Sequence, residues 1–297
     1  MLNKVVTAVL PLIPKKIVEI VSKPYIAGEN IFEAIKTVGK LNSLGALATI
    51  DVLGEDVFNA DESRTATKKS LEVLDFIASE KVNSNLSLKL SHLGLKINYS
   101  LCKENFNSIL SSAKEKNIFV RIDMEDHTTT DNTIKLFRDS RNFYDNIGVV
   151  IQAYLKRSES DINYLVKENA NIRLCKGIYN EPHEIAFKKR DEIQNNFLHL
   201  LEIIFKNNCY CGIATHDDVL INGAKKIISE LKIDKNKYEF QMLLGVRENL
   251  RNKIISDGYK LRIYTPFGKD WYAYSIRRLK ENPQMALYIT KAIFTKR

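Results

Sequence analysis

From about residue 44 onward, hydrophobic positions follow two alternating periodicities. Short β-branched or alternating apolar runs predict strands, and a longer segment with apolar residues at helical spacing follows each of them. Eight strands are predicted, at residues 44–50, 85–90, 118–122, 147–153, 171–175, 209–214, 238–243 and 260–264. Helical spacing is clearest over residues 66–80, 108–116, 184–207 and 219–231. No Gly-, Ser- or Pro-rich linker interrupts this pattern, so one domain is expected.

Strands that alternate with helices predict a parallel sheet, because each parallel crossover needs a connection of helix size. Eight such strands close a barrel whose interior is filled by side chains. An open doubly wound sheet is the rival, and it usually carries a glycine-rich phosphate turn. Neither a G-x-G-x-x-G motif nor a P-loop is present. We therefore expect an α/β fold: a (β/α)8 TIM-type barrel at residues 44–297, preceded by an N-terminal helical segment at residues 1–43.

The net charge of the chain limits the classes of ligand that it could bind but does not select one of them. Lys and Arg number 45 against 36 Asp and Glu, a net charge of +9. The basic clusters are short, so no nucleic-acid partner is expected. A basic surface favours anionic ligands or a negatively charged membrane.

The cysteines and apolar runs bear on metal binding and location. Four unclustered cysteines in a chain of 297 residues suggest reduced thiols and a cytoplasmic protein. Cys209 and Cys211 lack zinc-ligand spacing, and no metal site is expected. The apolar run at residues 5–13 is short and interrupted by prolines. It predicts a helix that closes one end of the domain, with peripheral contact to the inner face of the cell membrane as the alternative.

Polar side chains occur at the carboxyl end of every predicted strand, where active sites of such barrels lie. Asp51 alone resembles an ordinary turn former. Lys89, Gln152 and Arg173 do not, because each lies within an apolar run where burial is costly without a partner. A polar, partly cationic pocket is therefore predicted. Its candidate residues are Asp51, Lys89, Asp123, Gln152, Arg173, Lys176, Thr215, His216, Gln241 and Tyr264.

A last helix at residues 270–281 adds a second cluster of charge. Tyr274, Arg277, Arg278 and Glu281 lie at i, i+3, i+4 and i+7, which places them on one face. This face is either solvated, with a weak Arg277–Glu281 pair, or an anion clamp in which adjacent guanidinium groups bind a carboxylate.

Two other functions remain open at this point. A Schiff-base lyase using Lys89 or Lys176 is chemically feasible on a barrel. A non-catalytic basic module that binds nucleic acid or membrane is the other alternative.

Eight motifs together resemble those of proline dehydrogenases. They are SLKLS at 87–91, RIDMED at 121–126, VIQAY at 150–154, RLCKGIY at 173–179, ATH at 214–216, EFQML at 239–243, RIYTPFG at 262–268 and Y-x-x-RR-x-x-E at 274–281. The resemblance covers residues 25–294 and is to the single-function bacterial or archaeal branch. The chain is too short to carry the second dehydrogenase of the bifunctional proline-utilisation proteins.

The resemblance implies FAD bound without a Rossmann fold. It implies that Arg173 lies beside the flavin N5 and that Gln152 bonds the ring edge. The other residues implied to hold FAD are Lys176, Gly177, Thr215, His216, Gln241 and Glu281.

It also implies a substrate site with catalytic roles for Lys89, Asp123, Arg173 and Tyr264. Lys89, Arg277 and Arg278 would bind the proline carboxylate. Tyr179, Leu243, Tyr264 and Tyr274 would enclose its ring, and Asp123 would orient Tyr264. Glu55 would pair with Arg277 as a lid latch.

The implied reaction oxidises L-proline to Δ1-pyrroline-5-carboxylate. Electrons would pass to a quinone or other membrane acceptor, and a separate pyrroline-5-carboxylate dehydrogenase would act downstream. Tyr264 occupies the position where the hydroxyproline-preferring branch has serine, which favours proline. Cys175 departs from the family pattern, which usually has an aliphatic residue there.

Overall fold

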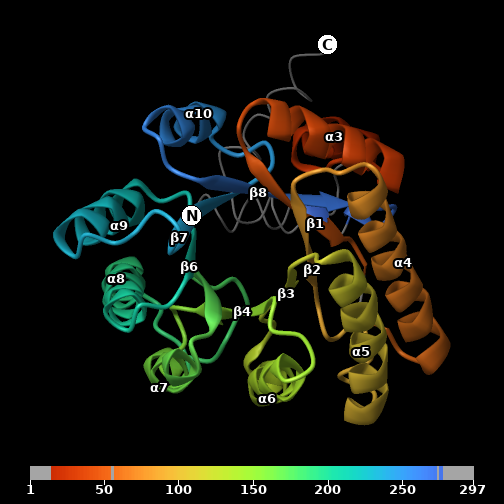
Figure 1. Ribbon diagram of the computed structural model, residues 1–297, viewed down its shortest axis with the longest axis horizontal. Helices are drawn as coiled ribbons and strands as arrows, with labels where there is room; N and C mark the ends of the chain where they lie inside the picture. Colours follow the sequence, from red (N-terminus) through yellow and green to blue (C-terminus); the bar gives the residue numbers. More distant parts are fainter. Residues whose placement is uncertain (1–14, 55–56, 273, 277–297) are drawn as a thin grey trace.

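In a computed structural model of the chain, eight parallel strands form a closed barrel in the order β1 to β8 (Figure 1). The structure describes residues 15–54, 57–272 and 274–276. The expected (β/α)8 fold is confirmed. The strands are β1 Leu47–Val52, β2 Ser84–Leu88, β3 Val120–Ile122, β4 Ile147–Gln152, β5 Asn171–Cys175, β6 Cys211–Ala214, β7 Tyr238–Leu243 and β8 Leu261–Phe267.

Pairing between the first and last strands closes the ring. Six residue pairs join β1 to β8, from Leu47 opposite Arg262 to Val52 opposite Phe267. Because every strand runs parallel to its neighbours, all eight carboxyl ends lie at the same end of the barrel.

Helices surround the strands on the outside of the ring (Figure 1). The α-helices are α2 Lys15–Ser22, α3 Ile31–Ser43, α4 Ala60–Ser79, α5 Tyr99–Lys116, α6 Thr130–Arg141, α7 Ser158–Leu165, α8 Arg190–Lys206, α9 Asp218–Glu230 and α10 Glu248–Ser256. Short 3-10 helices are η2 Lys23–Tyr25, η3 His127–Thr129 and η4 Val166–Glu168. One continuous hydrophobic cluster fills the space between the helices and the strands.

Side-chain caps set several helix starts. Asn59 caps α4 by accepting a hydrogen bond from the Glu62 amide, and Asp217 caps α9 through the Val219 amide. Asn98 caps α5, which ends at Asn117 in the left-handed conformation that asparagine tolerates. These caps place the loops after β1, β2 and β6 at the carboxyl end of the barrel.

The helix predicted at residues 184–207 begins later than expected, at Arg190. The preceding backbone pairs with another segment instead of entering a helix. Leu155 and Ala186 form an antiparallel bridge, and Phe187 N donates to Tyr154 O at 2.8 Å. This pairing leaves the chain after β5 as a loop at the carboxyl end of the barrel.

The N-terminal part of the chain packs on the closing seam of the barrel. α3 lies against β1 and β8 and buries Ala34, Ile35, Val38 and Leu41. The strand predicted from residue 44 begins at Leu47, because Leu44 terminates α3 and Gly45 turns the chain with φ +81°. A domain boundary at 43/44 stays a prediction. Within the described residues, no helix combines the length and apolarity needed to cross a membrane.

Candidate active site

A cavity of about 260 Å³ opens at the carboxyl ends of the strands. Residues on or after β1 to β8 contribute to its wall, so the closed barrel brings together side chains that are far apart in sequence. Thirteen of the residues named in the sequence analysis line this cavity: Asp51, Lys89, Asp123, Gln152, Arg173, Lys176, Gly177, Tyr179, His216, Gln241, Leu243, Tyr264 and Tyr274.

Asp51 and Lys89 form a nearly buried ion pair in this cavity. Lys89 Nζ lies 3.0 Å and 2.9 Å from the two carboxylate oxygens of Asp51. The side chains are 2% (Asp51) and 17% (Lys89) exposed. Burial by itself would lower the pKa of Lys89, but the carboxylates of Asp51 and Asp123 outweigh it and raise that pKa above its ordinary value. Lys89 is therefore an ammonium ion at neutral pH.

Asp123 is the hub of a second set of contacts. Its Oδ1 accepts from Arg173 Nη1 at 2.8 Å and from the Ser87 hydroxyl at 2.7 Å, and its Oδ2 accepts from the Tyr264 hydroxyl at 2.7 Å. Burial would raise the pKa of Asp123, but Arg173 and Lys89 outweigh it and lower that pKa. Burial and the nearby Asp123 raise the pKa of Tyr264, which therefore stays a hydrogen-bond donor.

A chain of hydrogen bonds between buried side chains orients the guanidinium group of Arg173. Arg173 Nε donates to Gln241 Oε1 at 2.6 Å, and Gln241 Nε2 donates to Glu239 Oε1 at 2.7 Å. Glu239 is held in turn by Arg262, whose Nε lies 2.6 Å from the same oxygen. Arg173 is thus fixed at Nε and at Nη1 by different partners, which leaves it little freedom to rotate.

Lys176 in the cavity wall and the neighbouring Arg190 both contact one buried carboxylate, that of Asp217. Asp217 Oδ2 accepts from Lys176 Nζ at 3.4 Å and from Arg190 Nη2 at 3.1 Å. The Lys176 and Arg190 side chains remain 42% and 75% exposed. These cations lie beside the start of α9, where backbone amides favour anions.

Three predicted cofactor residues have local contacts of their own. Gln152 Nε2 donates to Glu125 O at 2.8 Å. His216 Nε2 accepts from the Leu243 amide at 2.9 Å. Thr215 is buried, is not part of the cavity wall, and accepts from the Asp217 amide at 3.1 Å. The structure therefore brings Gln152 and His216 to the cavity and uses the Thr215 hydroxyl in a turn.

Four predicted residues lie outside the described residues, namely Glu55, Arg277, Arg278 and Glu281. The chain is helical at residues 271–272 and 274–276, and the buried Tyr274 lines the cavity. The clamp and the latch remain predictions.

One sequence-based interpretation needs correction. Asp51 is not an ordinary turn former, since it is the buried counter-ion of Lys89. Each of the three cations in the described wall has a carboxylate partner, since Asp51 pairs with Lys89, Asp123 with Arg173 and Asp217 with Lys176. Lys89, Arg173 and Lys176, the predicted cationic share of the pocket, all line the cavity. The requirement that a buried lysine has a partner was the signal that could have identified Asp51.

Sequence reasoning also missed two supporting carboxylates. Glu239 orients Gln241, and Glu125 accepts from the Ser91 amide at 2.9 Å while its carbonyl holds Gln152. Both lie inside motifs that had been noted for their neighbours. Among the described residues, no three His, Cys, Asp or Glu side chains form a group that could bind a metal ion.

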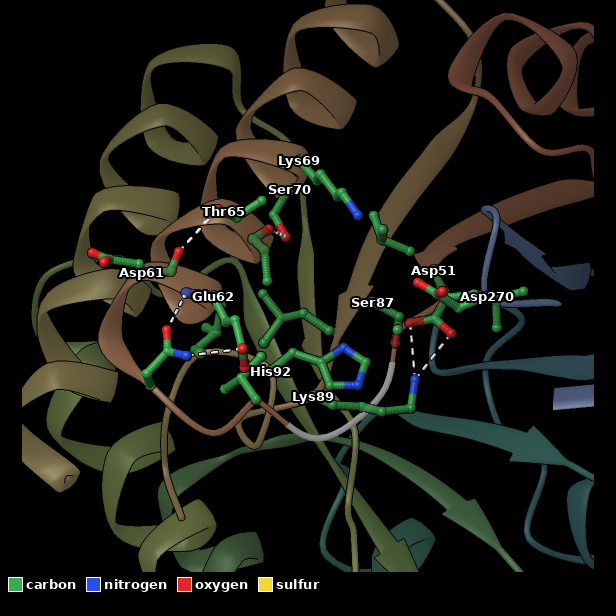
Figure 2. A pocket seen from close by; sticks show the side chains of 18 residues that line it. Asp51, Asp61, Glu62, Thr65, Lys69, Ser70, Ser87, Lys89, His92 and Asp270 are labelled. Atoms are coloured by element: carbon green, nitrogen blue, oxygen red, sulfur yellow. Dashed lines mark hydrogen bonds and ion pairs between the residues drawn. The ribbon is translucent and has the colours of Figure 1, made fainter. Parts of the chain in front are cut away.

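A second cavity of about 540 Å³ lies between the ends of β1 and β2 and the start of α4 (Figure 2). Its polar wall includes Asp61, Glu62, Lys69 and His92. Among the described residues, only Asp51 and Lys89 line both cavities. The ion pair therefore stands between them.

Comparison with known proteins agrees with this geometry. The sequence profile of the proline dehydrogenase family matches residues 34–289. Proline dehydrogenase 2 of Bacillus subtilis is 38% identical over 91% of this chain and 89% of its own length. Proline dehydrogenase of Deinococcus radiodurans is 32% identical, over 91% and 88% respectively. The chain belongs to the proline dehydrogenase family.

Solved structures of two proline utilization A proteins share the fold. Proline utilization A from Bdellovibrio bacteriovorus, inactivated by N-propargylglycine, matches with a TM-score of 0.84 and 25% identity over 89% of this chain. The homologue from Corynebacterium freiburgense matches with a TM-score of 0.79 and 20% identity over 99% of the chain. The present chain spans 33% and 34% of those two longer chains. The expected family is confirmed, and its barrel is the part that these proteins share.

Proposed function

We propose that this chain oxidises L-proline to Δ1-pyrroline-5-carboxylate with FAD as the hydride acceptor. Family membership supports proline oxidation. The observation that carries the proposal is the convergence of Lys89 and Arg173 on one cavity, where Asp51 holds Lys89 and Asp123 holds Arg173. One cation is available for a substrate carboxylate and the other for a group that gains negative charge.

The residues of the cavity fit a flat aromatic cofactor. Val150, Ala214, Met242 and Leu243 supply apolar wall, and Gln152 and Arg173 supply polar groups. Gly177 has φ +108°, and a Cβ there would lie 2.1 Å from the Tyr154 ring, so the loop after β5 requires glycine. The exposed Lys176 and Arg190 suit a diphosphate beyond the rim.

In the proposed complex, bound flavin supplies a two-electron acceptor at N5. Arg173, fixed by Asp123 and Gln241, would stabilise negative charge beside that ring. Gln152 would bond the ring edge, while Lys176, Gly177, His216, Gln241 and Glu281 would hold the remainder, with Thr215 buried behind them.

The substrate would be held by groups with separate tasks. Lys89 would bind its carboxylate together with Arg277 and Arg278, and Glu55 would latch Arg277. Tyr179, Leu243, Tyr264 and Tyr274 would enclose the ring. The Tyr264 hydroxyl donates a hydrogen bond to Asp123, which holds the side chain in place. The Tyr264 ring would then face the substrate.

Hydride departure from proline C5 requires an unprotonated ring nitrogen, whose lone pair assists it. The described cations are each paired with a carboxylate, which weakens the field that would lower the pKa of the substrate amine. The lowering of the amine pKa would therefore rest mainly on Arg277 and Arg278. We further propose that electrons pass to a quinone-type acceptor and that a separate dehydrogenase consumes the product.

The deciding experiment is an absorbance spectrum of the purified protein before and after anaerobic addition of L-proline. A flavin band that bleaches on addition is expected. A protein that neither contains nor takes up flavin, or whose flavin band is unchanged by proline, would overturn the proposal.

A further inference from the structure

The Lys89 side chain borders two cavities, so its ammonium group could point into either of them. It lies at the wall between the substrate cavity and the larger second cavity. The lining of the second cavity includes further acidic residues, among them Glu62 and Asp270 (Figure 2). A lysine side chain is long and flexible, and it loses rotamer freedom when it is held in one position. Without a local anchor, Lys89 would be free to turn toward those carboxylates.

Asp51 supplies that anchor. Both of its carboxylate oxygens accept from Lys89 Nζ, at 3.0 Å and 2.9 Å, and the Asp51 side chain is 2% exposed. β1 holds the Asp51 backbone rigidly through its pairing with Ser87 of β2 and Pro266 of β8. The Asp51 carboxylate is therefore buried on a strand that is paired on both sides, and two hydrogen bonds to it define the position of Lys89 Nζ.

Asp123 does not provide the same anchor. Its oxygens are engaged by Arg173, Ser87 and Tyr264, and its closest oxygen to Lys89 Nζ is 3.7 Å away. That separation is too long for a hydrogen bond but short enough for charge attraction. The Tyr264 hydroxyl is 3.5 Å from Nζ. Asp51 thus contributes the directional contacts, while Asp123 adds electrostatic attraction.

We propose that Asp51 is a positioning residue that holds the Lys89 ammonium at the shared wall of the two cavities, directed to the carboxylate of the substrate. This inference rests on the proposed function, since it concerns the same substrate site. It assigns to Asp51 a part in substrate binding that is exerted through Lys89.

Removing the Asp51 charge has a consequence that depends on pH. Among the described residues, the charged and titratable groups around Lys89 include Asp51 from β1, Asp123 and Glu125 after β3, Tyr264 from β8 and Arg173 from β5. His92 and Asp270 line the second cavity together with Lys89. In the intact site the carboxylates raise the pKa of Lys89 above 10.5, so its charge persists through pH 10. Without Asp51, burial opposes a weaker attraction and the charge is lost at lower pH.

The test measures binding of tetrahydro-2-furoate to the flavin-loaded enzyme. This probe has the proline carboxylate but an oxygen in place of the ring nitrogen, so its own amine does not titrate. Its dissociation constant is followed through the flavin spectrum from about pH 6 to about pH 10. The wild-type constant is expected to be flat over this range. A wild-type constant that weakens with a midpoint inside the range would show that Lys89 loses its charge there and would overturn the proposal.

The variant Asp51→Asn is expected to bind the probe about 10- to 100-fold more weakly at neutral pH, the usual effect of losing a charged hydrogen-bond partner. Its binding should weaken further as pH rises. Lys89→Met should weaken binding by a similar factor, and the double variant should be no weaker than Lys89→Met alone. Effects that multiply in the double variant, or wild-type binding in Asp51→Asn, would refute the positioning role.

Asp161→Asn is the matched control. Asp161 is 11% exposed and also makes two bonds to one cation, with Arg157 Nε at 2.8 Å and Nη2 at 2.9 Å, on α7. This variant should keep the wild-type constant and its flat pH profile. Failure of the proposed function is distinguishable, because then the wild-type flavin would not be reduced by proline. Normal reduction in the wild type with an unaffected Asp51→Asn would reject this inference alone.

Discussion

The Tyr264 hydroxyl donates a 2.7 Å hydrogen bond to Asp123, which joins the last strand to the residue that follows the third. The same carboxylate accepts from Arg173, whose guanidinium carbon lies 5.4 Å from the Tyr264 ring centroid. One anion therefore orders both the proposed wall of the substrate site and the proposed partner of the flavin. This coupling underlies the first two predictions.

Replacing Tyr264 with serine should change substrate preference. The smaller side chain opens space beside the pyrrolidine ring, and a hydroxyl on the substrate can occupy it. We expect the ratio of kcat/KM for 4-hydroxyproline to that for proline to rise by about 10-fold or more, the scale of pocket-size effects. Tyr264→Phe keeps the ring and removes only the hydroxyl, so its preference should stay near that of the wild type. An unchanged ratio in Tyr264→Ser would contradict the steric role.

Replacing Asp123 with asparagine should destabilise the fold. Arg173 then lacks its carboxylate partner in a buried site, a change that costs about 3–5 kcal/mol in comparable pairs. The pKa of Asp123 is lower in the folded protein than the ordinary value of 3.8. The pair therefore stabilises the fold fully above about pH 3.8, and this stabilisation is lost as the pH falls through the pKa that Asp123 has in the folded state. Denaturant unfolding at neutral pH should show the loss.

The control for that variant is Asp139→Asn. Asp139 is 39% exposed and pairs with Lys135 one helical turn earlier on α6. Its removal should change the free energy of unfolding by less than about 0.5 kcal/mol. Equal effects of the two substitutions would argue against an important buried pair at Asp123.

Borohydride should trap no carbonyl compound on Lys89. Schiff-base formation needs a neutral amine, and the carboxylates of Asp51 and Asp123 raise the pKa of Lys89 despite its burial. Peptide mass mapping after incubation with pyrroline-5-carboxylate or pyruvate and borohydride would measure this. A stoichiometric adduct at Lys89 would instead support the lyase alternative.

Gly177→Ala should impair flavin binding. The residue has φ +108°, and an added Cβ would lie 2.1 Å from the Tyr154 ring, so the loop after β5 must shift. We expect a flavin-to-protein ratio well below that of the wild type. Gly39→Ala on α3 is the control, because nothing lies within 4 Å of its added Cβ. It should keep full flavin content and gain about 0.5–1 kcal/mol of stability. Full flavin content in Gly177→Ala would show that the loop accommodates the side chain.

Much of the fold could be predicted because the hydrophobic pattern is local. The strands at 171–175 and 238–243 were located to the residue, since polar and apolar residues alternate along both segments and that period is typical of a strand. The start of α8 was missed because residues 185–187 pair with residues 154–156, a contact that no local periodicity records.

The sequence by itself determined the barrel, the positions of the strand-end polar residues and the family, since each depends on residue order along one chain. Only the tertiary structure decided how those polar residues pair. Lys89 and Asp51 are 38 positions apart, and Tyr264 and Asp123 are 141 apart. Closure of the ring brings them within hydrogen-bonding distance, and the low dielectric of the interior then makes their charges interdependent.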